Sequence, residues 1–244
     1  MNIFAGCATD RGNYRTKNQD RAVCHVMRRK GVCLAVACVC DGIGSFEESE
    51  IASKIVTDGI TRWFAGIEGL YPDSMDQDMV LEDLELTIRE LNEIVFDYRR
   101  DQGIPIGCTM SMLLLIDRGY HVFHAGDSRI CRLGDRMFDP LTRDEVSMVE
   151  ANGIVKALLA NYIGKSPTLW LNKISGTVEG AQLFLLGTDG LFRRLKFEDV
   201  STMAKYIKND HRAQTACEYL LRVVMERGEK DNISCILLAV TSSI

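Results

Sequence analysis

Residues 32–45 read V-C-L-A-V-A-C-V-C-D-G-I-G-S, an apolar run that stops abruptly at Asp41 and Gly42. A continuous apolar run rich in β-forming residues predicts a strand. The run from Val32 to Cys40 is far shorter than the roughly 20 residues that a membrane-spanning helix needs. The stretch therefore predicts a core strand that places an aspartate and a glycine at its end.

The composition is that of an ordinary globular protein. The chain has 244 residues, of which 46% are hydrophobic and 26% are charged, which allows a sizeable core and excludes disordered and collagen-like classes. The 29 Lys and Arg residues against 34 Asp and Glu residues give a formal net charge of −5. A broad basic surface is therefore not expected. We predict no nucleic-acid partner and no membrane partner.

Cysteine usage and the N-terminus indicate a cytoplasmic protein. The chain has nine cysteines, an odd number, with no C-x-x-C pair, and most of them lie in apolar runs. This usage is typical of reduced thiols that pack as small hydrophobic residues. The first residues, MNIFAGCATDRG, lack the basic and long apolar regions of a signal peptide.

The order of the remaining patterns predicts an α+β fold. Further strand-like runs lie at 3–9, 21–29, 108–116, 119–126, 128–133, 173–179, 183–188 and 233–240, and helical periodicity covers 47–65, 78–100, 197–208 and 212–227. Helices in two consecutive pairs and strands in runs differ from the regular alternation of a doubly wound parallel sheet. Because no linker or repeat interrupts the chain, we expect residues 1–244 to form one domain.

Four aspartates lie at the ends of these apolar runs. Asp41, Asp127 and Asp189 each follow a run, and Asp231 precedes the last one. Each aspartate alone is explained by ordinary turn chemistry. If the four converge at one rim of a sheet, their mutual repulsion requires cations. Mg²⁺ and Mn²⁺ prefer such oxygen ligands, and Gly42 would allow a backbone carbonyl to approach an ion closely.

Seven short motifs follow one another along the chain. They are R-T-K-N-Q-D (15–20), D-G-I-G-S (41–45), G-C-T (107–109), G-D-S-R (126–129), L-T-R-D (141–144), T-D-G-L (188–191) and D-N-I-S (231–234). Each is weak alone, but in this order they resemble the motifs of the PPM (type 2C) metal-dependent serine/threonine phosphatases. The resemblance spans residues 6–240, at spacings similar to those of compact bacterial members.

The resemblance implies a fold and a set of metal ligands. The family fold is a sandwich of two antiparallel β-sheets with a pair of antiparallel helices on each outer side. By the same resemblance, Asp41 bridges two Mn²⁺ or Mg²⁺ ions, Gly42 binds one ion through its carbonyl, and Asp189 and Asp231 complete the other. Asp127 matches the position that, with Asp189, helps to hold a third ion in many bacterial relatives.

The resemblance also implies the catalytic roles. Two metal ions activate a bridging water that hydrolyses phosphoserine and phosphothreonine in proteins, so Asp41 counts as catalytic. Arg15 matches the arginine that grips the substrate phosphate, and a guanidinium suits phosphate because it binds two oxygens at once. Asp20 and its neighbour Gln19 match supporting positions. We expect Arg129 to form a structural ion pair, and Arg193 to be a solvated charge.

Three positions depart from the common pattern of the family. Gln19 stands where relatives usually have glutamate, which predicts weaker binding at one ion. Phe46 replaces a histidine that can protonate the leaving alkoxide, which predicts slow turnover of alkyl phosphates. Glu145 and Val146 replace His-Ser near the site, which predicts a different substrate preference.

Three functions are consistent with these residues. The leading hypothesis is a monomeric phosphoprotein phosphatase that opposes a serine/threonine kinase. A non-catalytic phosphoprotein-binding scaffold on the same fold is the alternative that Gln19 and Phe46 motivate. A phosphatase dedicated to a single partner switch is a third hypothesis, which no residue of the sequence marks.

Overall fold

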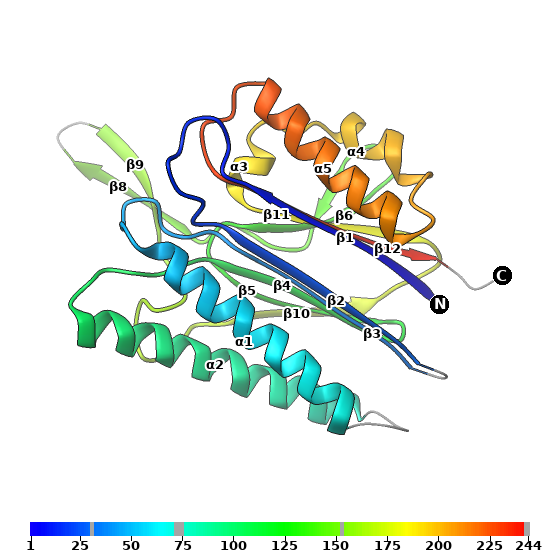
Figure 1. The fold of residues 1–244 in the computed structure, drawn as a ribbon, viewed down its shortest axis with the longest axis horizontal. Helices are drawn as coiled ribbons and strands as arrows, with labels where there is room; N and C mark the ends of the chain where they lie inside the picture. The colour runs from blue at the N-terminus through cyan, green and yellow to red at the C-terminus, as the bar shows by residue number, and fades with distance from the viewer. Residues whose placement is uncertain (30–31, 71–75, 152–153, 242–244) are drawn as a thin grey trace.

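Two five-stranded antiparallel sheets lie face to face at the centre of the fold (Figure 1). The computed structural model describes residues 1–29, 32–70, 76–151 and 154–241. In spatial order the first sheet contains β1 (Asn2–Asp10), β12 (Ile233–Thr241), β11 (Gln182–Gly187), β6 (Arg129–Leu133) and β7 (Phe138–Pro140). The second contains β10 (Asn172–Thr177), β5 (Gly119–Ala125), β4 (Met110–Ile116), β3 (Val32–Cys40) and β2 (Arg21–Arg29).

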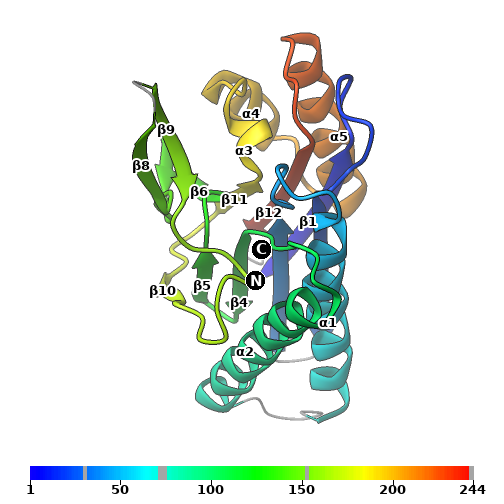
Figure 2. The same cartoon turned by 90° about the vertical axis from the view of Figure 1, so that its left-hand side faces the viewer.

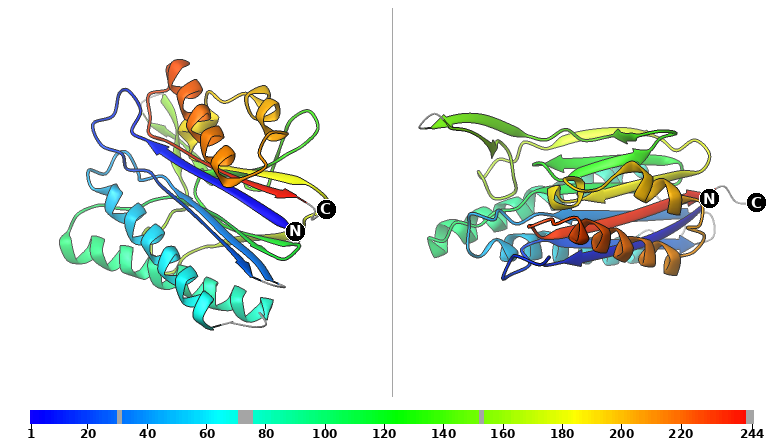
Figure 3. Two further views of the ribbon diagram at one scale, coloured as in Figure 1. Left: turned by 45° about the vertical axis from the view of Figure 1, so that its right-hand side comes forward. Right: turned by 90° about the horizontal axis from the view of Figure 1, so that it is seen from above.

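Helices cover the outer face of each sheet (Figures 1 and 3). The second sheet is covered by α1 (Ser49–Leu70) and α2 (Gln77–Gln102), and the first by α4 (Phe197–Ala204) and α5 (Asp210–Glu226). A short helix, α3 (Asp189–Phe192), follows β11 directly. The four layers confirm the predicted α+β sandwich with a helix pair on each side.

Strand β3 shows why this sequence forms four layers. Side chains alternate between the two faces of a strand. Leu34, Val36 and Cys38 accordingly pack against α1 and α2, whereas Ala35 and Ala37 pack between the two sheets. All of these side chains are fully buried. The part of this apolar run from Leu34 to Cys40 is therefore buried on both faces of its sheet.

One two-stranded sheet stands apart from the sandwich and was not predicted. It pairs β8 (Val146–Ala151) with β9 (Ile154–Leu159) and projects beside the end of the sandwich where β11 leads into α3 (Figure 2). Met148, Val155 and Leu158 are exposed on it, so no buried face produces the alternating pattern by which a strand is recognised. Within the described residues, no helix is both long and apolar enough to cross a membrane.

Candidate active site

The predicted site residues meet around one pocket of about 390 Å³. Its lining includes Arg15, Asp41, Gly42, Asp127, Asp189 and Asp231. Both sheets contribute, because Asp41 and Asp127 follow β3 and β5 of the second sheet, whereas Asp189 and Asp231 adjoin β11 and β12 of the first. The structure thus brings together side chains that are up to 216 positions apart in the sequence.

The backbone at Asp41 is fixed by Thr109. The Asp41 amide donates a hydrogen bond of 2.9 Å to Thr109 Oγ1, and its carbonyl accepts one of 2.8 Å from the Thr109 amide. Gly42 packs so closely that a Cβ there would lie 2.7 Å from the carbonyl oxygen of Gln19. A larger residue at position 42 would therefore displace the segment that precedes β2.

Asp20 lies behind the pocket rather than in its lining. Its Oδ2 accepts hydrogen bonds from the hydroxyls of Thr188 (2.8 Å) and Ser234 (2.9 Å), while its Oδ1 is buried without a hydrogen-bond partner. Burial raises the pKa of Asp20 to about 7, although both hydroxyls oppose the shift. A buried carboxylate oxygen without a partner is costly unless water or a cation satisfies it.

The carboxyl groups of the pocket resist simultaneous ionisation. Burial, followed by repulsion from Asp20, Asp189 and Asp127, raises the pKa of Asp41 well above its ordinary value. Burial and the charge of Asp189 raise the pKa of Asp127 to about 6, and burial also raises the pKa of Asp189. Bound cations would reverse these shifts, because they favour the charged form.

Two arginines already neutralise part of this charge. Arg15 Nε donates to Asp231 Oδ1 at 2.8 Å, and Arg193 donates to Asp231 and Glu229, both at 3.2 Å, and to Asp189. Although burial favours the neutral form of Asp231, its hydrogen bonds with Arg15 and Arg193 leave its pKa lowered.

The prediction that Arg193 is merely a solvated charge is wrong. Its side chain is 46% exposed but pairs with three carboxylates of the site. The reason is local: α3 begins at Asp189, and residues four apart lie on the same face of a helix. By contrast, the structural ion pair expected of Arg129 is confirmed, since Arg129 binds both carboxylate oxygens of Asp144 at 2.7 and 2.6 Å.

Replacing Arg193 by glutamine should increase the electrostatic repulsion between Asp189 and Asp231, because it removes the positive charge that is bonded to both. Partly exposed ion pairs contribute about 0.2–1 kcal/mol each, so we expect the metal-free variant to melt a few degrees lower. Mn²⁺ should bind it roughly fivefold more tightly, because no guanidinium competes for Asp189 and Asp231. Calorimetric Mn²⁺ titration and melting curves measure both effects. Arg222→Gln, at an exposed position on α5, is the control, and unchanged affinity in Arg193→Gln would contradict the expectation.

The structure shows what contacts are made by the residues that depart from the family pattern. Gln19 Nε2 donates to the carbonyl of Phe46 at 2.7 Å, so this amide supports a loop of the pocket. The Phe46 ring lines the pocket itself. Glu145 accepts hydrogen bonds from the Gly126 amide (2.9 Å) and from Asn161 (2.7 Å), and thereby joins the segment before β8 to the residue preceding Asp127.

Asn232 is a site residue that the sequence analysis missed. Its side chain accepts a hydrogen bond from the Gln19 amide and donates to the carbonyls of Arg11 and Lys17, each at 2.9 Å. These bonds hold both ends of the loop that carries Arg15. Asn232 lies inside the D-N-I-S motif (231–234), but an asparagine is common in turns, so the motif predicts a role only for Asp231.

Asn232→Ala should loosen the Arg15 loop without removing any charge. The change leaves one amide and two carbonyls without their partner, at a cost of about 1–3 kcal/mol in unfolding free energy. Hydrogen exchange at the Gln19 amide should accelerate, and KM for a phosphorylated substrate should rise more than kcat falls. Unaltered exchange at Gln19 would count against this role, and Asn13→Ala, at an exposed position in the same loop, is the control.

The donors fit hard divalent cations. Among the described residues, no three His, Cys, Asp or Glu side chains form a ready metal-binding cluster as they lie, and Arg193 bonds to two of the carboxylates instead. The oxygen-only donor set, the unpartnered Asp20 Oδ1 and the raised pKa values are nevertheless the features that Mg²⁺ or Mn²⁺ would satisfy.

Comparisons with known proteins agree with this geometry. The family model for protein phosphatase 2C matches residues 13–234. Protein phosphatase PhpP of Streptococcus pneumoniae is 25% identical over 95% of both chains. A bacterial serine phosphatase structure superposes with a TM-score of 0.80 at 19% identity, covering 100% of both chains. Serine/threonine phosphatase Stp1 from Staphylococcus aureus superposes with a TM-score of 0.77 at 20% identity, covering 99% of this chain and 96% of Stp1.

The chain therefore belongs to the protein phosphatase 2C family, the PPM family of metal-dependent serine/threonine protein phosphatases, and is an enzyme of that class.

Proposed function

We propose that this chain removes phosphate from phosphoserine and phosphothreonine in proteins, at the pocket between Arg15 and the four aspartates. The observation that carries the proposal is the convergence of Arg15, Asp41, Asp127, Asp189 and Asp231 on one pocket of about 390 Å³. A cationic side chain beside a set of oxygen donors suits a phosphate ester held against metal ions.

The metal ligands form part of the proposal. Asp41, the Gly42 carbonyl, Asp189 and Asp231 would hold two Mn²⁺ or Mg²⁺ ions, and Asp127 with Asp189 a third. When bound, such ions supply the acidification of water and the positive charge that phosphate ester hydrolysis needs. The chain itself supplies a fixed arrangement of carboxylates, supported from behind by Asp20 and Gln19.

Arg15 would bind the phosphate. Among the described residues, only Asp231 bonds to it, at Nε, and the side chain is 44% exposed. The terminal nitrogens of the guanidinium therefore remain available for two phosphate oxygens. Because Asp231 fixes the side chain, little rotamer freedom is lost when substrate binds.

The lining of the described pocket contains no histidine to protonate a leaving alkoxide, and Phe46 lies where relatives have one. We therefore infer that aryl phosphates, whose leaving groups need less protonation, turn over faster than alkyl phosphates.

The test is hydrolysis of p-nitrophenyl phosphate and of a phosphothreonine peptide with Mn²⁺, with Mg²⁺ and with a chelator. The proposal requires metal-dependent turnover of both substrates and calorimetric binding of at least two ions. A folded protein that binds these ions but hydrolyses neither substrate would refute it. A folded protein with negligible metal affinity would favour the non-catalytic scaffold instead.

We also propose a cellular location, a domain organisation and an oligomeric state for the enzyme. All nine cysteines are free thiols, which supports a reducing, cytoplasmic location. We propose one catalytic domain, since the two sheets share a continuous apolar layer. We further propose that the enzyme is a monomer and that it reverses the action of a serine/threonine kinase.

A further inference from the structure

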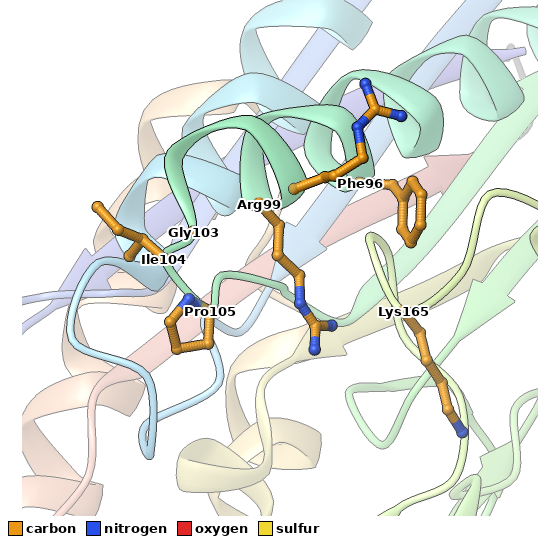
Figure 4. Close-up of a pocket in the computed structure, with 7 residues that line it drawn as sticks. Phe96, Arg99, Gly103, Ile104, Pro105 and Lys165 are labelled. Carbon is orange, nitrogen blue, oxygen red and sulfur yellow. The ribbon is translucent and has the colours of Figure 1, made fainter.

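A second pocket, of about 400 Å³, lies at the C-terminal end of α2 (Figure 4). Its lining includes the apolar residues Phe96, Ile104 and Pro105 and the cationic residues Arg99, Arg100 and Lys165. All of its ionisable lining residues are cations. The pocket thus suits an anionic group carried on a short apolar stem.

Two of the three cations have no anionic partner among the residues that the structure describes. Arg100 is paired with Asp97 (2.8 Å) and Asp101 (3.0 Å). Arg99 donates only to neutral oxygens, the Tyr162 hydroxyl at 3.4 Å and the Gly164 carbonyl at 3.5 Å, and Lys165 donates to the Ala160 carbonyl. Within the described chain, no carboxylate pairs with Arg99 or Lys165. Their two charges remain available to a ligand.

Two aromatic side chains that line the active-site pocket lie beside cations of this basic pocket. The Arg99 guanidinium lies 6.0 Å from the centre of the Phe46 ring, and Lys165 Nζ lies 6.0 Å from the centre of the Tyr162 ring. Phe46 and Tyr162 both line the active-site pocket. An extended peptide advances about 3.3–3.6 Å per residue, so the 6.0 Å between the Arg99 guanidinium and the Phe46 ring corresponds to about two residues.

A phenylalanine at position 46 interacts more favourably with Arg99 than a histidine would. The face of an aromatic ring attracts a guanidinium, whereas a protonated histidine at position 46 would repel it. The departure from the family pattern at Phe46 is thereby linked to the basic pocket.

We propose that this basic pocket binds an anionic side chain of the phosphoprotein substrate, a few residues from the phosphorylated residue. The inference rests on the proposed phosphatase function and names its substrate class: acidic segments, whether the anion is a carboxylate or a second phosphate. The aspartates of the active site repel additional anions, and the basic pocket offers the anion a separate position beyond Phe46 and Tyr162.

The experiment compares three phosphothreonine peptides that differ three residues to either side of the phosphate: alanine, glutamate or a second phosphothreonine. Wild-type protein should show roughly three- to tenfold higher kcat/KM for the two anionic peptides than for the alanine peptide at low salt, and a smaller ratio at 0.5 M NaCl. The glutamate and phosphate arms distinguish the two sources of anion.

The double change Arg99→Gln/Lys165→Gln should bring the ratio of kcat/KM between the anionic peptides and the alanine peptide to about one. Lys165→Gln alone should lower this ratio in part, and it should leave α2 intact because Lys165 lies in an exposed loop. Arg62→Gln, exposed on α1, is the matched control and should keep the wild-type ratio. A wild-type ratio near one, or a ratio that survives the double change, would overturn the inference.

If no peptide is hydrolysed, the proposed function fails, but the inference remains testable by binding. Fluorescence anisotropy with the labelled glutamate and alanine peptides should show the same preference in wild-type protein and its loss in the double variant. Equal dissociation constants for the two peptides in wild-type protein would refute the basic pocket as a docking site.

Discussion

Asp189→Asn should lower kcat for p-nitrophenyl phosphate roughly a thousandfold, which corresponds to about 4 kcal/mol of transition-state stabilisation. Asp189 lines the active-site pocket, and its carboxylate is proposed to serve two of the metal positions. A neutral amide keeps the shape of the side chain but loses the charge that attracts a divalent cation.

The same change should leave the fold intact. Arg193 retains Asp231 and Glu229 as partners after Asp189 is neutralised, and one source of repulsion for Asp41 is removed. The melting temperature without metal should therefore stay within a few degrees of wild type. The rise in melting temperature on adding Mn²⁺ should shrink, because ligand-induced stabilisation follows affinity.

Asp135→Asn is the matched control, since Asp135 is exposed in the turn between β6 and β7. It should leave both kcat and the Mn²⁺-induced stabilisation unchanged. If Asp189→Asn also retained wild-type kcat and Mn²⁺ affinity, the assignment of Asp189 to the metal site would be wrong.

Phe184→Ala should cost about 3–5 kcal/mol of unfolding free energy, the usual range for a large aromatic side chain removed from a core. Phe184 is fully buried between the two sheets, with its ring 5.7 Å from that of Tyr120 in a tilted arrangement. Neighbours from both sheets restrict relaxation, so a cavity should remain.

Urea denaturation, followed by circular dichroism, measures this loss. Leu86→Ala on α2 is the control, because Leu86 is 61% exposed and should change stability by no more than about 0.5 kcal/mol. A loss below about 1 kcal/mol for Phe184→Ala would show that the layer between the sheets can collapse around the missing ring.

The sandwich could be predicted from the sequence because its strands have buried faces. In β12, Cys235 and Leu237 pack against the helices while Ile236 and Leu238 pack against the other sheet, so the strand appears as a continuous apolar run. β8 and β9 offer no such signal, because most of their described apolar side chains, including Met148 and Val155, are exposed. Their position depends on pairing with each other, which a single sequence does not reveal.

The active-site residues that could be predicted from the sequence are those that stand at the end of an apolar run. Asp41 and Asp189 were conspicuous because a charge directly follows apolar residues. Arg193 and Asn232 were not, because an arginine directly after a short helix and an asparagine in a turn are common for ordinary reasons. Their roles depend on contacts with Asp231 and with the Arg15 loop, which arise only in three dimensions.

The place of β12 between β1 and β11 has a consequence for synthesis of the protein on the ribosome. β1 emerges early, but its hydrogen-bonding neighbour is made more than 200 residues later, as the separation of 216 positions between Arg15 and Asp231 illustrates. Closing so long a loop slows folding. A nascent chain would therefore carry Arg15 and Asp41 without a working pocket, and the enzyme would become competent only after nearly all of the chain has left the exit tunnel.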